Sequence, residues 1–156
     1  IKLKHLIGAK LDVINKYRTN RRSNKNQWNH KASTTGMSWD DEAWFENPPC
    51  HYTASIAVKA AEMQGKTAGL KFLRKLREML FLENLNISDE NILTQCAEQA
   101  DLDINEFKKD MKLTGTLKAL QCDMRITSEM NVTVLPTLVF FNVYTSEEGI
   151  MVTGDN

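Results

Sequence analysis

The sequence contains few of the residues that mark specialised architectures. Its 156 residues include three cysteines, three prolines and seven glycines, which excludes a collagen-like or low-complexity chain. It has no run of about 18 apolar residues, the length that a membrane-spanning helix requires. No basic stretch followed by an apolar one opens it, so we expect no secretory signal within it. Length and composition are those of one globular domain.

The three cysteines, Cys50, Cys96 and Cys122, form neither a redox motif nor a metal-binding pattern. Their number is odd and no two are spaced as C-x-x-C, which argues against a disulfide framework. Cys96 and Cys122 have apolar neighbours on predicted helices, and we expect both to be buried thiols. Cys50 precedes His51, but adjacent residues seldom point at each other and no third group orients them. The histidines lack zinc-ligand spacing with the cysteines, so we expect no catalytic residue, no metal and no cofactor.

The net charge of zero conceals an uneven distribution. Residues 1–31 contain nine Lys and Arg and one acid, whereas residues 32–156 contain eleven basic and nineteen acidic residues. The segment Tyr17–Trp28 mixes basic and aromatic residues, as nucleic-acid-binding proteins also do. A solvated polar helix end is the interpretation that we favour, and steering of an acidic protein partner is a further use. We therefore expect no nucleic acid among the partners.

The order of the predicted elements is typical of an α/β domain. Alternation of apolar and polar residues over 1–8 predicts a strand. A basic helix and a long loop are expected over 9–51, and a block of helices over 52–131. Residues 132–156 are rich in β-branched and aromatic residues, which predicts a loop and two strands. Helices thus lie between strands in a single domain over residues 1–156.

Local signals place several helix ends. Gly65 ends the first helix of the block, and Ser88 is expected to cap another. Asp103 with Glu106 three residues later resembles a capping box. Between these, one helix has a leucine stripe at intervals of three and four residues that we expect to face the core, formed by Leu70, Leu73, Leu76 and Leu80.

Pro136 opens the apolar strand of the last third. Inside a strand it would remove a hydrogen-bond donor, so it must lie at the beginning. An ordinary trans proline at a strand start is one interpretation. The other follows from a resemblance: in the thioredoxin superfamily, a proline just before a central strand is cis, and its backbone can pair with an extended partner chain.

A series of short segments carries a more specific resemblance, over most of residues 36–150. The segments are Phe45, Lys59–Gly65, Phe72–Arg74, Glu106–Asp110, Lys118–Met124, Glu129–Met130, Pro136–Leu138, Phe140–Asn142 and Glu148–Gly149. In this order they resemble the family of Spx-binding adaptors of Gram-positive bacteria, called YjbH or SpxH. The resemblance extends well beyond what a shared superfamily fold requires.

This resemblance implies a fold, a function and a compartment. The family has a DsbA-like thioredoxin fold with a large helical insertion between strands. Its members are cytoplasmic adaptors that bind the transcriptional regulator Spx and promote its degradation by the ClpXP protease. They also carry an upstream strand and helix with a cysteine motif and a further C-terminal region. Because neither is present in this sequence, we expect the domain to be incomplete at both ends.

The same resemblance places the candidate partner-binding residues. Leu135, Pro136 and Thr137 form the loop nearest a partner in thioredoxin-like geometry, with Pro136 as the cis-proline. Trp44 and Phe45 are loop aromatics, which either belong to a satellite core or anchor an interface, and both are added as candidate anchors because aromatic residues dominate binding hot spots. An enzyme of the same fold, a thiol-disulfide oxidoreductase or glutathione-dependent isomerase, is the alternative, but it needs an upstream thiol with a partner.

Overall fold

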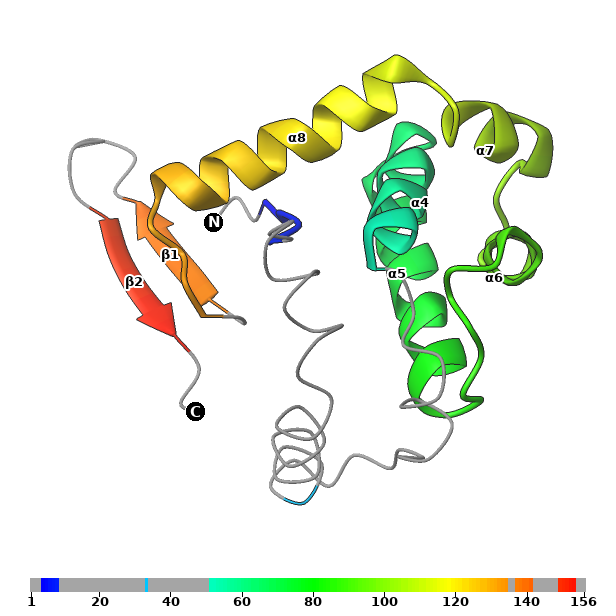
Figure 1. The fold of residues 1–156 in the computed structure, drawn as a ribbon, viewed down its shortest axis with the longest axis horizontal. Coiled ribbons are helices and arrows are strands. Elements are labelled where there is room, and N and C mark those ends of the chain that lie inside the picture. Colours follow the sequence, from blue (N-terminus) through cyan, green and yellow to red (C-terminus); the bar gives the residue numbers. More distant parts are fainter. Residues whose placement is uncertain (1–3, 9–32, 34–50, 135–136, 142–148, 154–156) are drawn as a thin grey trace. The chain divides into compact units, whose positions relative to one another are not determined.

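The computed structural model describes residues 4–8, 33, 51–134, 137–141 and 149–153. Along these residues a series of helices is followed by two strands (Figure 1). In chain order the elements are α4 (His51–Met63), α5 (Lys66–Phe81), α6 (Glu90–Gln99), α7 (Ile104–Asp110), α8 (Thr114–Glu129), β1 (Thr137–Phe141) and β2 (Gly149–Thr153).

The chain divides into two compact units. The helical unit comprises residues 9–121, and the strand unit comprises residues 1–8 together with residues 122–156. In sequence, the helical unit therefore lies between the two parts of the strand unit. Helix α8 begins in the helical unit and ends in the strand unit. The prediction of a single domain stays a prediction.

An aromatic pair lies in the core of the helical unit. The rings of Phe72 on α5 and Phe107 on α7 have centroids 5.3 Å apart and planes inclined by 42°, and both side chains are almost wholly buried. Helix α4 packs against α5, α6 and α7, and α6 also contacts α5 and α7. Burial of these apolar side chains is the main stabilising contribution. The other large side chains buried to the same degree are Met79, Leu93, Cys96, Thr116 and Leu120.

Small residues allow α4 and α5 to approach closely. Ala57, Ala60 and Ala61 of α4 have no exposed surface. On α5, a Cβ added to Gly69 would lie 2.5 Å from Cγ of Glu62 and 3.2 Å from its Cα. The contact between the two helices therefore depends on glycine at position 69.

Two glycine substitutions are expected to have opposite effects on stability. Gly69→Ala should lower the free energy of unfolding by about 1–2 kcal/mol, because overpacking outweighs the gain in helix propensity. A Cβ added to Gly115 in α8 would meet nothing within 4 Å. Gly115→Ala should therefore raise the free energy of unfolding by about 0.5–1 kcal/mol. Urea denaturation followed by circular dichroism measures both. Equal stabilisation by the two substitutions would contradict the close approach at Gly69.

The caps of two helices test the predictions of helix ends. The N–H of Glu106 donates to Oδ1 of Asp103 at 2.9 Å, so the predicted cap of α7 is confirmed. The predicted cap at Ser88 is wrong by one residue. Asp89 is the N-cap of α6, and its carboxylate accepts a hydrogen bond of 2.8 Å from the N–H of Asn91. A carboxylate in this position also interacts favourably with the helix dipole.

Among the residues that the structure describes, four with positive φ mark turns at helix ends. Gly65 has φ 125 and lies between α4 and α5, as predicted for a glycine that ends a helix. The other three are Asn84, Asp101 and Asn131, with φ between 52 and 59. Asparagine and aspartate tolerate the left-handed region better than other side chains with a Cβ.

The strand unit contains a two-stranded antiparallel sheet. Thr137 lies opposite Thr153, and Phe141 lies opposite Gly149. The prediction of an apolar strand and a partner strand near residue 149 is therefore confirmed, although β1 begins only at Thr137.

The strand predicted over residues 1–8 is wrong for the residues described. Residues 4–8 form neither helix nor strand. The N–H of Ile7 donates instead to Oδ2 of Asp123 on α8, at 3.1 Å. A strand needs a neighbouring ladder, and among the described residues β1 and β2 pair with each other.

Candidate functional site

The candidate site is the segment that joins α8 to β1. Of the predicted partner-binding residues, Thr137 is the first residue of β1 and is half-buried. Leu135, Pro136, Trp44 and Phe45 lie outside the described residues. Their assignment as partner-binding residues, and that of Pro136 as a cis-proline, stay predictions.

The end of α8 sets the direction from which the chain enters this segment. The N–H of Val132 donates to the carbonyl of Thr127, and the N–H of Asn131 donates to that of Ser128, both at 3.0 Å. With Asn131 at φ 52, these bonds form a Schellman motif. Val132 follows the left-handed residue and is buried. Burial of Val132 therefore fixes the chain three residues before Leu135.

A side-chain hydrogen bond holds the two ends of the candidate loop together. The hydroxyl of Thr137 donates to the carbonyl oxygen of Val134. The two residues that this bond joins are three positions apart in the sequence. Thr137 thus contacts Val134 through its side chain and also occupies the first ladder position of β1.

The sheet beyond this loop exposes many apolar side chains. Leu138 is 55% exposed, Phe140 56%, Ile150 70% and Val152 50%. Leu138 lies opposite Val152 and Phe140 opposite Ile150, so the four share one face because side chains alternate along strands. The sequence does not predict this exposure, because an unbroken apolar run is typical of a strand buried on both faces.

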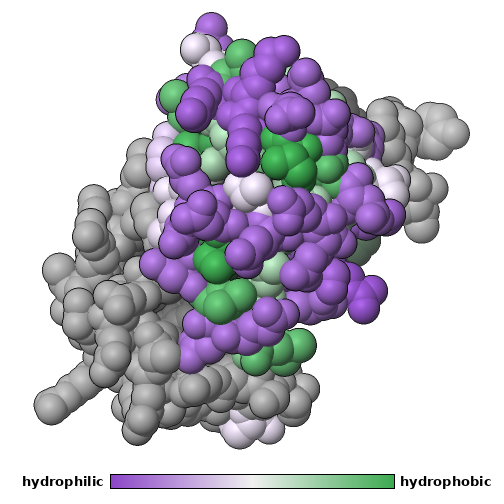
Figure 2. Space-filling model, turned by 90° about the vertical axis from the view of Figure 1, so that its right-hand side faces the viewer, coloured by the Kyte–Doolittle hydropathy of each residue, from purple (hydrophilic) through white to green (hydrophobic). Residues whose placement is uncertain are grey.

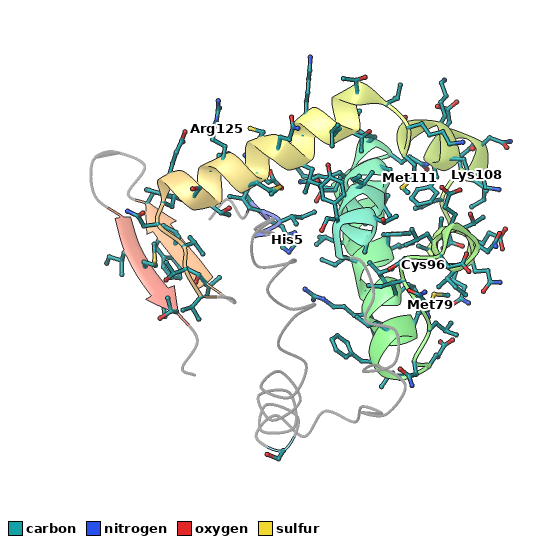
Figure 3. The ribbon with its side chains drawn as sticks, viewed as in Figure 1. His5, Met79, Cys96, Lys108, Met111 and Arg125 are labelled. Atoms are coloured by element: carbon teal, nitrogen blue, oxygen red, sulfur yellow. The ribbon has the colours of Figure 1, made fainter. Side chains whose placement is uncertain are left out.

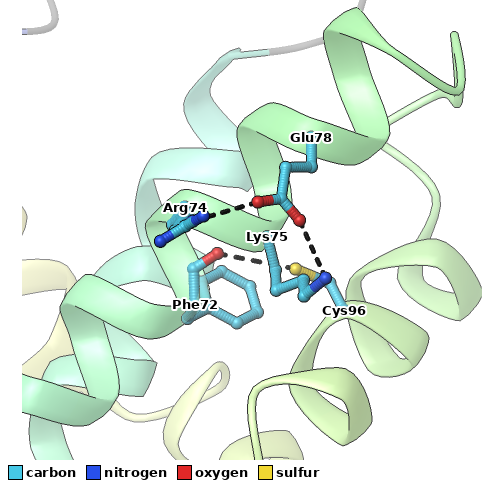
Figure 4. A network of polar contacts seen from close by, with 5 residues as sticks. All are labelled: Phe72, Arg74, Lys75, Glu78 and Cys96. Atoms are coloured by element: carbon cyan, nitrogen blue, oxygen red, sulfur yellow. Dashed lines mark hydrogen bonds and ion pairs between the residues drawn. The ribbon is translucent and has the colours of Figure 1, made fainter.

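Two cysteines are described, and neither has a thiol partner. Both Cys96 and Cys122 are free. Cys96 is fully buried on α6, and its thiol donates to the carbonyl of Phe72 at 3.6 Å (Figures 3 and 4). Burial raises the pKa of the Cys96 thiol to about 12. The prediction for Cys96 is confirmed, but that for Cys122 is wrong, because Cys122 is exposed on α8. Cys50 lies outside the described residues.

An ion-pair network on α5 lies beside Cys96 in Figure 4. The carboxylate of Glu78 accepts from Nε of Arg74 at 3.0 Å and from Nζ of Lys75 at 2.8 Å. The hydrogen bond to Glu78 raises the pKa of Lys75, and the same bond lowers the pKa of Glu78. Both charges therefore persist at neutral pH.

The described part of the chain contains neither a group of metal-ligating residues nor a candidate membrane-spanning helix. No group of three or more His, Cys, Asp or Glu residues there is arranged to hold a metal ion. Among the same residues, no helix has the length and apolar content of a membrane span. Figure 2 shows a face on which hydrophilic side chains predominate and apolar ones form separate patches.

Comparison with known proteins places the chain in a family. The family model described as thioredoxin matches residues 1–156. The chain belongs to the thioredoxin family. The predicted thioredoxin-like α/β class is thereby confirmed, whereas the DsbA-like branch stays a prediction.

Individual relatives of this thioredoxin-family chain share one name. The chain is 46% identical over 160 residues to the ClpXP adapter protein SpxH of Halalkalibacterium halodurans, with 98% of the chain and 52% of the relative covered. It is 45% identical over 155 residues to the protein of the same name from Bacillus subtilis, with 97% and 52% covered. The match to the Shouchella clausii protein of that name is 52% identical over 103 residues, 66% of the chain and 34% of the relative. The chain spans about half the length of the first two relatives.

Proposed function

We propose that this protein is a cytoplasmic adaptor that binds the regulator Spx and promotes its degradation by the ClpXP protease. The observation that carries the proposal is 46% and 45% identity, over nearly the whole chain, to two proteins named ClpXP adapter protein SpxH. Fold alone would not carry it, because thioredoxin-like folds serve many functions.

The chemistry of the described thiols supports binding rather than catalysis. Thiol-disulfide exchange requires a thiolate with access to a second sulfur. Cys96 is buried and its raised pKa keeps it protonated. Cys122 is exposed, but a single exposed thiol does not make an exchange centre. An adaptor needs no bond-making group, because tethering a client near the protease raises its effective concentration.

We infer that the partner contacts the loop that precedes β1. Leu135, Pro136 and Thr137 would lie nearest the client, with Trp44 and Phe45 as further anchors. The turn at Asn131 and the bond from Thr137 to Val134 support this assignment, because they hold both ends of the loop. Flanking residues that are held in place before binding lose less conformational entropy when the partner docks.

A degradation assay with purified ClpXP and Spx tests the proposal. Adding the protein should increase the initial rate of Spx loss by at least about tenfold, because tethering raises the effective concentration of Spx at the protease. Thr137→Val should reduce this stimulation, because the hydrogen bond from the Thr137 hydroxyl to the carbonyl of Val134 is lost. Thr153→Val makes the same change directly across the sheet and should leave the stimulation intact.

Two results would contradict the adaptor function. The first is an unchanged rate of Spx loss at saturating protein. The second is reduction of insulin disulfides at a rate comparable to thioredoxin, which would favour the oxidoreductase. Equal effects of Thr137→Val and Thr153→Val would instead contradict only the placement of the contact loop.

A further inference from the structure

Helix α5 has a basic stripe on its solvent-facing side. We define the α5 stripe as Lys66, Leu70, Arg74 and Arg77, whose spacings of four, four and three residues keep them on one face. All four are exposed. The opposite side of the helix is the buried one and consists of Gly69, Phe72, Leu76, Met79 and Leu80. The stripe is thus the part of α5 that the helical core does not use.

The charge of α5 contrasts with that of the chain around it. The helix carries five basic residues and one acid, whereas residues 32–156 as a whole have an excess of eight acids. Glu78 pairs with Arg74, whose side chain remains 83% exposed. Lys66 and Arg77 make no ion pair with any residue that the structure describes. Two cations of the stripe are therefore not neutralised within the described chain.

Apolar side chains accompany these cations. Leu70, in the middle of the stripe, is 56% exposed. Met63, the last residue of α4, is 55% exposed, and Leu82, just after α5, is 69% exposed. Apolar contact area next to unpaired cations is the composition of a surface that recognises an amphipathic acidic segment.

We propose that the α5 stripe is a docking surface for an acidic amphipathic segment of a partner protein. Carboxylates of the segment pair with Lys66 and Arg77, and one of its apolar side chains covers Leu70. This surface lies wholly within the helical unit. It does not depend on the identity of the client held at the loop before β1, so the inference goes beyond the proposed function.

A protein segment fits the stripe better than a nucleic acid does. Phosphate-binding surfaces are dominated by cations and often include aromatic rings for base stacking. Here Leu70 interrupts the cations, and the carboxylate of Glu78 lies 3.0 Å from Nε of Arg74. A second carboxylate, that of Asp101, lies 3.6 Å from Nζ of Lys71. Both would repel a polyphosphate, whereas a segment with few, spaced carboxylates can avoid them.

The test uses the full chain and a defined probe. The probe is a fluorescein-labelled synthetic helical peptide with leucines at intervals of three and four residues and glutamates between them. Fluorescence anisotropy should show binding that weakens as salt is raised. Lys66→Glu with Arg77→Glu should weaken binding at least about tenfold, and Leu70→Ala about fivefold, because interface charges and apolar anchors each contribute.

A matched charge reversal controls for nonspecific electrostatics. Lys108→Glu with Lys112→Glu makes the same change of charge at exposed positions on and just after α7. It should leave the affinity for the peptide unchanged. All substituted side chains are exposed, so far-UV circular dichroism and thermal melting should match the unsubstituted protein.

Several outcomes would overturn the proposal. These are no binding of the acidic peptide, equal loss in the α7 control, and unchanged affinity in the Leu70→Ala and double α5 variants. Tighter binding of duplex DNA that the α5 variants abolish would assign the stripe to nucleic acid. Self-association that the α5 variants abolish and the peptide does not inhibit would assign it to a second copy of the chain.

Discussion

Phe72→Ala is expected to lower the free energy of unfolding of the helical unit by about 3–5 kcal/mol, the range for removal of a buried phenylalanine. The substitution leaves a cavity between α5 and α7 and removes the ring pair with Phe107. Phe72 has no exposed surface, so its replacement by alanine costs more stability than the same substitution of a surface residue. Since whole domains are stable by only about 5–15 kcal/mol, this substitution removes a large share of the total stability.

Urea denaturation monitored by circular dichroism measures this loss. Phe72→Leu keeps most of the volume and should cost about 1–1.5 kcal/mol, so it provides a folded comparison. Leu82→Ala is the matched control, because Leu82 is 69% exposed and should change stability by no more than about 0.5 kcal/mol. Similar losses for Phe72→Ala and Leu82→Ala would show that Phe72 is not part of the core.

The thiols of Cys96 and Cys122 should differ in alkylation rate by more than about a hundredfold at pH 8, because only thiolates react. The pKa of Cys96 is raised to about 12 by burial, so its thiol stays protonated and out of contact with the reagent. Cys122 is exposed. Iodoacetamide labelling followed by peptide mass spectrometry should therefore modify Cys122 in the folded protein, and both thiols in urea.

The same pKa gives stability a dependence on alkaline pH. In the unfolded chain the Cys96 thiol ionises near 9.0, and in the folded protein near 12. Because the folded pKa is the higher, this contribution is fully present below pH 9 and is lost as pH rises from 9 to 12. The slope is up to about 1.4 kcal/mol per pH unit. Cys96→Ala should remove this slope, and rapid labelling of Cys96 at pH 8 would contradict the burial itself.

Sequence periodicity predicted the helical block but not which side of each helix is buried. Leu70 is exposed although it belongs to the leucine stripe, because Gly69 and Phe72 lie on the inner side of α5. In α8 the buried positions include Thr116, Asp123 and Thr127. A buried side with two threonines and an aspartate cannot be recognised from apolar spacing, so the apolar neighbours of Cys122 predict a burial that this thiol does not have.

Three helix ends carry a sequence signal that does not involve glycine. Asn84, Asp101 and Asn131 adopt positive φ, and each is followed by an apolar residue. Two of those, Leu102 and Val132, are buried. A polar residue that tolerates the left-handed region, followed by one that must be buried, is a helix ending that can be recognised without glycine. The exposed face of the β1–β2 sheet had no such signal, because exposure depends on what packs on a strand and not on its own residues.

Helix α8 is continuous from Thr114 to Glu129, so its middle and its last turn form one helical segment. Leu120, near the middle of α8, has no exposed surface, and the last turn of the same helix leads through Asn131 to Thr137. Helix formation is cooperative along the chain, so order in that last turn depends on the packing that holds Leu120. Such linkage is reciprocal: an event that tightens the segment before β1 also favours the packed form of the helix at Leu120.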